Sequence, residues 1–158
     1  MTAFDQKLFR NALGMFATGI TIVTTTTTTG DPIGMTVNSF ASVSLDPPLV
    51  LWSVGQHANS FDIFTQTTHF AIHVLRQDQE SLSNRFASRG EDKFGDLAWQ
   101  PGEYGSPILP EYAVCFQCQT EHAYPGGDHT ILVGRVMNFD DRGDQEALLY
   151  FRGGYRYL

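Results

Sequence analysis

The stretch GMTVNSFASVSLDPP at residues 34–48 limits what this chain can fold into more than any other part of the sequence. Its odd positions are apolar apart from Ser39, and its even positions from 36 to 44 are polar apart from Phe40. Side chains alternate between the two faces of an extended strand, so the pattern predicts one strand that ends at Asp46 and two prolines. One face would enter a core, and the other would present small uncharged groups. That second face suits a half-exposed strand of an antiparallel sheet, and it also suits a flat heterocyclic ligand.

Length and charge narrow the class of protein. A chain of 158 residues is expected to form one domain, residues 1–158, with a sizeable core. The net charge of -7 argues against nucleic acid or an anionic membrane as partner, and no apolar run approaches the roughly 20 residues of a membrane span. No signal peptide is visible, so a cytoplasmic location is expected. Aromatic residues at 13% and charged residues at only 17% indicate buried interface area, and therefore an oligomer.

A helix is predicted before the first strand. Thr2 and Asp5 resemble a capping pair at its start, and Gly19 is its expected end. Its apolar side chains recur at helical spacing, which indicates packing in the core or against another subunit: Phe4, Leu8, Phe9, Ala12, Leu13 and Phe16.

Six or seven short strands joined by tight turns are predicted, and this number points to an antiparallel barrel. Asn59 or Ser60 is expected to begin one short helix, and Asp78 a second that runs to about residue 87. Residues 88–110 form a long loop, in which Trp99 and Tyr104 either cover a pocket or pack on the surface. Besides the stretch described first, the predicted strands are 20–29, 49–54, 70–75, 112–123, 129–139 and 147–151.

Few residue patterns with known catalytic chemistry are present. Cys115 and Cys118 are three apart on a predicted strand and so face opposite ways, which indicates two structural thiols rather than a redox or zinc pair. His69 and His73 also lie on a predicted strand, where a spacing of four is no helical metal pair, and no metal site is expected. No nucleophile elbow, phosphate loop or G-x-G-x-x-G is found. His129, which follows Gly-Gly-Asp, would either contact a ligand or lie exposed in a turn.

Several longer segments resemble the flavin reductase family with the FMN-binding split-barrel fold. In chain order they are FRNALGMFATGITIVTT, GMTVNSFASVSLDPPLVL, ASRGEDKFGDLAW, GSPILP, GGDHTILVGRV and LLYFRGGYR. The resemblance implies a mainly β fold, an antiparallel Greek-key split β-barrel with flanking helices. It also implies a homodimer, with a flavin in a groove near the interface.

The resemblance further implies roles for individual residues. His129 resembles the family histidine that helps to place the nicotinamide. Many members carry a basic residue where this chain has Gln56-His57-Ala58, which leaves the choice of FMN or FAD open. The residues that resemble the family's flavin and nucleotide contacts are Met35, Thr36, Val37, Asn38, Ser39, Ser42, Trp52, Ser53, Val54, Asn59, Ser60, Arg85, Phe86, Tyr155 and Arg156.

The implied function is an NAD(P)H:flavin oxidoreductase that supplies reduced FMN or FAD to a separate monooxygenase, with NADH or NADPH as reductant. Hydrogen-bond donors near the ring would stabilise its reduced form, and Thr36, Asn38 and Ser42 are expected to supply them. Hydride transfer needs position more than a general acid, which agrees with the absence of a catalytic dyad. Two alternatives stay open: a flavin-binding electron carrier without fast NAD(P)H turnover, and a non-catalytic split-barrel subunit.

Overall fold

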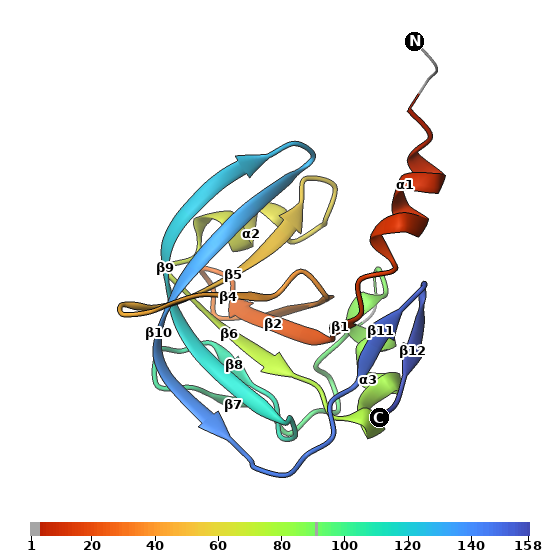
Figure 1. Ribbon diagram of the computed structural model, residues 1–158. Coiled ribbons are helices and arrows are strands. Elements are labelled where there is room, and N and C mark those ends of the chain that lie inside the picture. The colour runs from red at the N-terminus through yellow and green to blue at the C-terminus, as the bar shows by residue number, and fades with distance from the viewer. Residues whose placement is uncertain (1–3, 91) are drawn as a thin grey trace.

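The computed structural model describes residues 4–90 and 92–158, and seven strands of this part form one strongly curved antiparallel sheet (Figure 1). The strand order is β3-β2-β6-β9-β10-β5-β4, so neighbours in the sheet are often distant in the chain. The expected antiparallel, mainly β architecture is therefore confirmed. The seven strands are β2 (Thr21–Thr26), β3 (Pro32–Val37), β4 (Ala41–Leu45), β5 (Pro48–Gly55), β6 (His69–Val74), β9 (Val114–Gly126) and β10 (His129–Asp141).

The sheet closes on itself because its two ends pack on the same core. Val37 at the end of β3 belongs to the same buried cluster as Val50 and Val54 of β5, although β3 and β4 are the opposite edges of the sheet. The crossing between the edges is fixed by Ser39, whose hydroxyl accepts from the Ser53 N–H at 2.9 Å and donates to the Ser53 carbonyl at 3.3 Å. The small polar residue in the apolar half of the pattern thus joins two strands.

The single strand predicted over residues 34–45 is wrong. The chain leaves the sheet after Val37 and re-enters it at Ala41, on the other edge. The expected buried face does not continue beyond the break, since Leu45 is 96% exposed and Val43 is 48% exposed. Alternation predicts faces only within one continuous strand, and the sequence pattern runs unbroken through a change of edge.

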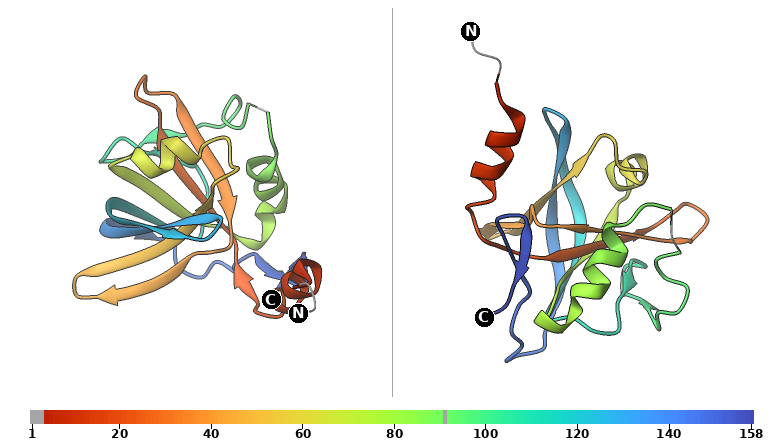
Figure 2. Two further views of the ribbon diagram at one scale, coloured as in Figure 1. Left: turned by 90° about the horizontal axis from the view of Figure 1, so that it is seen from above. Right: turned by 90° about the vertical axis from the view of Figure 1, so that its right-hand side faces the viewer.

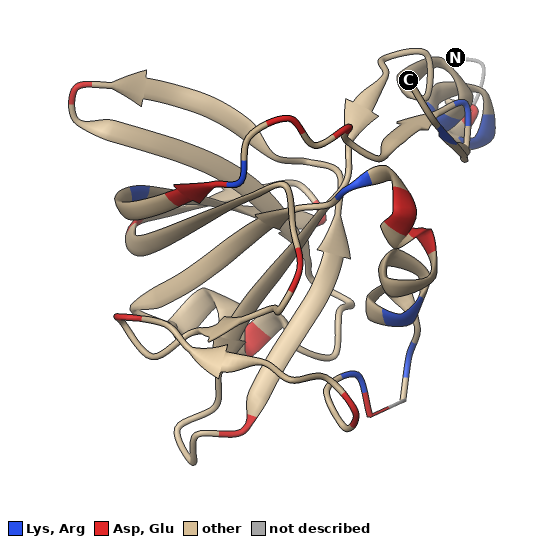
Figure 3. Cartoon of the chain, turned by 90° about the horizontal axis from the view of Figure 1, so that it is seen from below, with Lys and Arg blue, Asp and Glu red and all other residues tan. Residues whose placement is uncertain are grey.

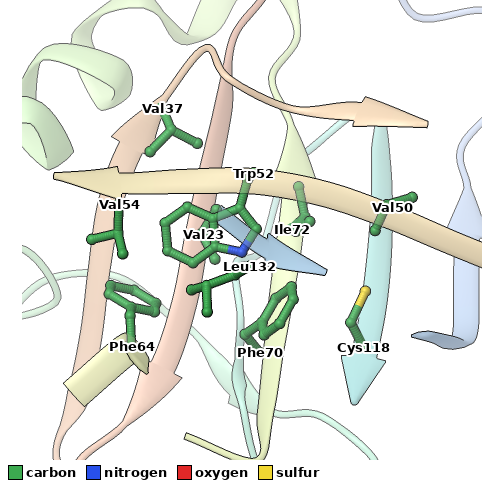
Figure 4. Packing of buried hydrophobic residues seen from close by; sticks show 10 residues of the cluster. All are labelled: Val23, Val37, Val50, Trp52, Val54, Phe64, Phe70, Ile72, Cys118 and Leu132. Atoms are coloured by element: carbon green, nitrogen blue, oxygen red, sulfur yellow. The ribbon is translucent and has the colours of Figure 1, made fainter. Parts of the chain in front are cut away.

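Large aromatic side chains fill the barrel interior (Figure 4). Trp52 is fully buried and meets the rings of Phe64 at 4.9 Å and Phe70 at 5.9 Å between centroids, both edge to face. Removing such a side chain from a core costs roughly 3–5 kcal/mol, so this cluster is a main source of the fold's stability.

Helix α1 (Gln6–Leu13) lies outside the sheet, beside the β11–β12 hairpin (Figures 1 and 2). The Asp5 carboxylate accepts from the Lys7 and Leu8 backbone N–H groups, as a capping residue should, whereas Thr2 lies outside the described residues. The sequence predicted that the helix would end at Gly19, but it ends at Gly14. The Gly14 N–H donates to the Arg10 and Ala12 carbonyls and so closes the last turn. Its apolar side chains are exposed and none is buried within this chain.

A C-terminal hairpin, β11 (Leu149–Phe151) and β12 (Gly154–Arg156), forms a small sheet with β1 (Thr18–Gly19). Only its first strand was predicted. Arg152 and Gly153 make the tight turn, with φ of 51° and 74°. The Arg152 N–H donates to the Gly14 carbonyl at 2.8 Å, which joins the hairpin to the end of α1.

The remaining helices are α2 (Phe61–Gln66), the 3-10 turn η1 (Gln77–Gln79) and α3 (Glu80–Ala87). Asp78 does not cap α3, because its carboxylate pairs with the Arg76 side chain at 2.8 Å. The Gln79 side chain instead accepts from the Arg76 N–H at 2.8 Å. No helix of the described part is long and apolar enough to cross a membrane.

The long loop after α3 carries the short strands β7 (Gln100–Pro101) and β8 (Pro107–Ile108). Trp99 packs edge to face on Phe94 at 6.0 Å, and Tyr104 stacks on His69 at 5.5 Å. Of the two alternatives for these aromatic residues, surface packing is the one observed.

The cysteines and the central histidine of β6 are structural groups. Cys115 and Cys118 are free thiols that belong to different buried clusters, as expected for opposite faces of a strand, and burial raises the pKa of each to about 12. His73 is fully buried, and its Nε2 accepts from the Leu109 N–H at 3.2 Å. Its Nδ1 therefore carries the hydrogen and donates to the Ile22 carbonyl at 3.1 Å.

Candidate functional site

A cleft of about 780 Å³, called here the main cleft, opens where four segments from different parts of the chain meet. They are residues 31–36 at the start of β3, 55–60 after β5, 86–90 with 92–94 after α3, and 128–129 at the β9–β10 turn. Ligand sites of small molecules commonly have volumes of roughly 300–1,000 Å³. Six of the residues proposed from the sequence line it: Met35, Thr36, Asn59, Ser60, Phe86 and His129.

The hydroxyl of Ser60 is available to a ligand in this cleft. Ser60 precedes α2 in the N-cap position, yet its side chain makes no capping hydrogen bond. Among the described residues, its hydroxyl forms a hydrogen bond only to the Met35 sulfur, at 3.9 Å, and a thioether sulfur is a weak acceptor. Asn59 lies beside it on the same wall and is exposed.

Thr36 does not supply the hydrogen-bond donor that was expected of it. Its hydroxyl donates to the Ser83 carbonyl of α3 at 2.6 Å, and a hydroxyl has a single hydrogen to give. The contact ties β3 to α3, so Thr36 shapes the wall of the cleft.

The other proposed residues lie outside the main cleft. Val37, Trp52 and Val54 have their side chains in the barrel core, while Ser39 and Ser53 bond to each other. Ser42 is exposed on β4, at the far edge of the sheet, so the donor role expected of its hydroxyl finds no support in this cleft. Sequence resemblance did not separate residues that support the cleft from residues that line it. Arg85, Tyr155 and Arg156 are also absent from the lining, and Asn38 lines a different cleft.

Cations reach the main cleft from the segment after α3, which is partly blue in Figure 3. Arg89 and Lys93 both line the cleft. The Lys93 ammonium donates to the Phe86 carbonyl at 2.9 Å and to the Gly34 carbonyl at 3.3 Å, which links the end of α3 to β3. Arg85 stays outside and pairs with Asp96 at 2.5 Å, which lowers the pKa of that carboxyl. Both cations belong to the segment ASRGEDKFGDLAW, which resembles the family, but the sequence analysis proposed no site residue between Phe86 and His129.

The opposite rim of the cleft holds His129 and Asp128. His129 begins β10 and lies opposite Gly55 of β5. Its Nδ1 is 2.7 Å from Asp128 Oδ1, and this hydrogen bond lowers the pKa of the Asp128 carboxyl. The imidazole of His129 is therefore oriented by its neighbour in the chain. Asp128 was not selected from the sequence, although it directly precedes His129.

A second cleft of about 730 Å³ lies between α1 and the β11–β12 turn. Asn38, Tyr150 and two guanidinium groups, those of Arg10 and Arg152, are part of its lining. Among the described residues that line it there is no acidic side chain. Within the described part, no three His, Cys, Asp or Glu side chains gather as a metal site.

The geometry of the main cleft favours a flat ligand with an anionic end. The wall formed by residues 32–36 and 55–60 has no Asp, Glu, Lys or Arg side chain, whereas Asp31 and Asp92 also line the cleft. Arg89 and Lys93 can pair with phosphate oxygens at the other end. The oriented imidazole of His129 can form a hydrogen bond to a second ligand group at the rim.

Comparison with known proteins points in the same direction. Residues 13–158 match the family model described as flavin reductase like domain. The chain is 52% identical to the FMN reductase (NADH) of Agrobacterium fabrum over 96% of its own length and 85% of that protein. It is 43% identical to the reductase component of the flavin-dependent trigonelline monooxygenase of Acinetobacter baylyi over 92% of its length, and it spans only 47% of that protein. Its fold is similar to a Streptomyces globisporus NADH:FAD oxidoreductase solved with NAD and FAD fragments, with a TM-score of 0.92, 37% identity, and coverage of 98% of this chain and 93% of the other.

Proposed function

The chain belongs to the flavin reductase-like domain family, and on this premise we propose that the main cleft is where hydride passes from NAD(P)H to a flavin. The protein is an oxidoreductase, an NAD(P)H-dependent flavin reductase. The observation that carries the assignment of the site is the meeting of an uncharged wall, two cations and an oriented histidine in one cleft of about 780 Å³.

The residues of the cleft fit a flavin nucleotide. The exposed Asn59 side chain and the Ser60 hydroxyl, which makes no capping hydrogen bond, offer hydrogen bonds to a ring or ribityl chain. Arg89 and Lys93 take the part of the basic residue that is missing at residues 56–58, and they would hold the phosphate. When bound, the flavin supplies the hydride acceptor, while the protein supplies position and electrostatics.

Each wall has its own task in this proposal. Met35 packs against the ring, the buried Phe86 supports this wall from behind, and Asn59 and Ser60 bind the polar chain. His129 orients the nicotinamide from the rim, so that its C4 comes within roughly 3–3.5 Å of the acceptor atom. The residues outside the cleft, including Trp52 and Ser53, support these walls from the barrel.

The test is stopped-flow reduction of FMN and of FAD by NADH and by NADPH. His129→Ala should slow reduction at least tenfold while the flavin dissociation constant changes less than twofold, because the residue contacts the nicotinamide and not the flavin. Ser60→Ala should have the reverse effect. A bound flavin that is reduced at a negligible rate would favour the electron carrier, and failure to quench flavin fluorescence would favour a non-catalytic subunit. If His129→Ala weakened flavin binding as much as it slowed flavin reduction, the role proposed for His129 would be refuted.

We also propose that the reduced flavin leaves for a separate monooxygenase, as the names of several relatives suggest for those proteins. This transfer would occur in the cytoplasm, where NAD(P)H is available. Flavin reduction by NADH should then support turnover of such an oxygenase when the two proteins are mixed.

The proposed assembly is a homodimer. In each subunit, residues 1–158 would form a single domain. The apolar face of α1 supports this, because Leu8 is 66% and Leu13 59% exposed in the single chain. A second copy would remove this surface from water. Leu8→Asp should shift the mass measured by light scattering toward the monomer, whereas Gln6→Asp on the same helix should not. A wild-type protein of monomer mass would contradict the proposal.

A further inference from the structure

We propose that Asp128 is a positioning residue for His129, and that the pair presents the His129 Nε2 lone pair to the carboxamide N–H of the nicotinamide. The inference rests on the proposed function, since it concerns the nicotinamide in the main cleft. It goes further by assigning a second residue and by stating which ligand group is recognised.

The hydrogen bond between the two residues determines which nitrogen carries the hydrogen. Asp128 Oδ1 lies 2.7 Å from His129 Nδ1, and an ionised carboxylate can only accept. Nδ1 is therefore the donor, and in the neutral ring Nε2 is left with a lone pair.

The turn that carries Asp128 is itself held in place. The Gln56 N–H donates to the Asp128 carbonyl at 2.9 Å, and the Gln56 side-chain amide donates to the Gly127 carbonyl at 3.1 Å. Gly127 has φ of 68°, a conformation that favours glycine. Gln56 is thus joined to the turn by one backbone and one side-chain hydrogen bond, which hold the Asp128 backbone in place beside the His129 ring.

The free nitrogen lies at the cleft wall. A Cβ placed on Gly55 would be 3.4 Å from His129 Nε2, so the imidazole edge lies over a residue without a side chain. No residue of the described part bonds Nε2. A ligand that enters over Gly55 meets this nitrogen as an acceptor.

The charge of the pair agrees with the reaction. Loss of hydride leaves positive charge on the nicotinamide ring. With a neutral imidazole the Asp128–His129 pair carries one negative charge, which stabilises the developing cation. With an imidazolium the pair would have no net charge, and this stabilisation would be lost. The carboxamide N–H of the nicotinamide is a donor, and it matches the acceptor at Nε2.

The first experiment is a thermodynamic cycle between the protein and the ligand amide. Its substrates are NADH and its 3-acetylpyridine analogue, whose acetyl group has no N–H. The ratio of kcat/KM for NADH to that for the analogue should fall about fivefold in Asp128→Ala and in His129→Ala, with Asp128→Asn in between because its amide oxygen still accepts. The analogue also has a different redox potential from NADH. This difference affects the ratio equally in all variants, so it cancels when the variants are compared. Asp62→Asn, an exposed carboxylate outside the cleft, is the charge control.

The second experiment is nitrogen-15 NMR of the His129 ring, which reports which ring nitrogen carries the hydrogen. If Asp128 had only a structural role, its removal would not change this tautomer. The wild type should show the Nδ1–H tautomer, and Asp128→Ala should shift the population toward Nε2–H. An unchanged substrate ratio in Asp128→Ala, or a wild-type ring with hydrogen on Nε2, would overturn the inference. Absence of NADH-dependent flavin reduction in the wild type would refute the proposed function instead, and the NMR result would still report on the pair.

Discussion

Gly34→Ala is expected to weaken folding and flavin binding together, because Gly34 lies at the closest approach of β3 and α3. A Cβ at this position would be 2.5 Å from Phe86 Cε1, 2.8 Å from Phe86 Cδ1 and 3.1 Å from Phe94 Cζ. Phe86 is fully buried and packs edge to face on Phe94 at 5.0 Å, so its ring has no free space to enter. The end of α3 must move instead, and this end is a wall of the main cleft.

The size of the effect follows from the overlap. Forcing one additional carbon into a well-packed core costs roughly 1–3 kcal/mol. In a chain of this length each kcal/mol lowers the melting temperature by about 2–4 °C, so a decrease of roughly 4–8 °C is expected for the middle of that range. Because Phe86 and Gly34 both line the cleft, the flavin dissociation constant should rise about three- to tenfold.

Thermal unfolding followed by circular dichroism and flavin titration followed by fluorescence measure the two effects. Gly19→Ala is the matched control, since a Cβ there meets nothing within 4 Å. Combining Gly34→Ala with Phe86→Leu should give a smaller loss than the sum of the single changes, because the shorter side chain leaves room for the new methyl group. A Gly34→Ala protein that melts and binds flavin like the wild type would refute the proposed overlap.

Three other predictions concern groups that are buried or partly buried in the fold. Burial lowers the pKa of His73 to about 4 from 6.5, so the unfolded chain binds the extra proton between these pH values, and the free energy of unfolding should fall by about 3 kcal/mol as pH drops from 6.5 to 4. Urea unfolding at several pH values checks this, and a His73→Asn protein with the same pH slope would contradict it. Cys115 and Cys118 should not react with a thiol reagent at pH 8 until urea unfolds the protein, and rapid labelling of the native state would show that burial does not control them. Ser39→Ala should lower the free energy of unfolding by about 1–2 kcal/mol while the exposed Ser42→Ala changes it little, and equal effects would remove the structural role of the Ser39–Ser53 contact.

Local pattern predicted the elements of this fold better than their ends. The opposite faces of the two cysteines and the long hairpin of β9 and β10 were evident from spacing. Asp5 was expected to follow Thr2 as the second member of a capping box, and in the structure it caps the helix itself. The break after Val37 was not, because alternation is the same on both sides of it. The hydrogen bond from the Arg152 N–H to the carbonyl of Gly14, where α1 ends, joins residues distant in the sequence, so a local pattern does not indicate it.

The candidate site was predictable in outline for the same reason. Met35, Ser60 and His129 belong to segments that resemble the family, and the structure brings them to one cleft. The commitment of the Thr36 hydroxyl to Ser83 arises only when β3 and α3 pack together, and no spacing in the sequence indicates it.

The C-terminal hairpin acts at a distance from any ligand. The Tyr155 hydroxyl is 2.9 Å from both the Ser83 hydroxyl and the Asn84 side-chain oxygen, and Tyr157 bonds the Glu80 carboxylate, so the last residues of the chain brace α3 from behind. Proteolytic trimming of these residues, or a purification tag fused directly to Leu158, would therefore change flavin affinity without altering a single group that touches the flavin. Protein made for binding studies is better tagged elsewhere.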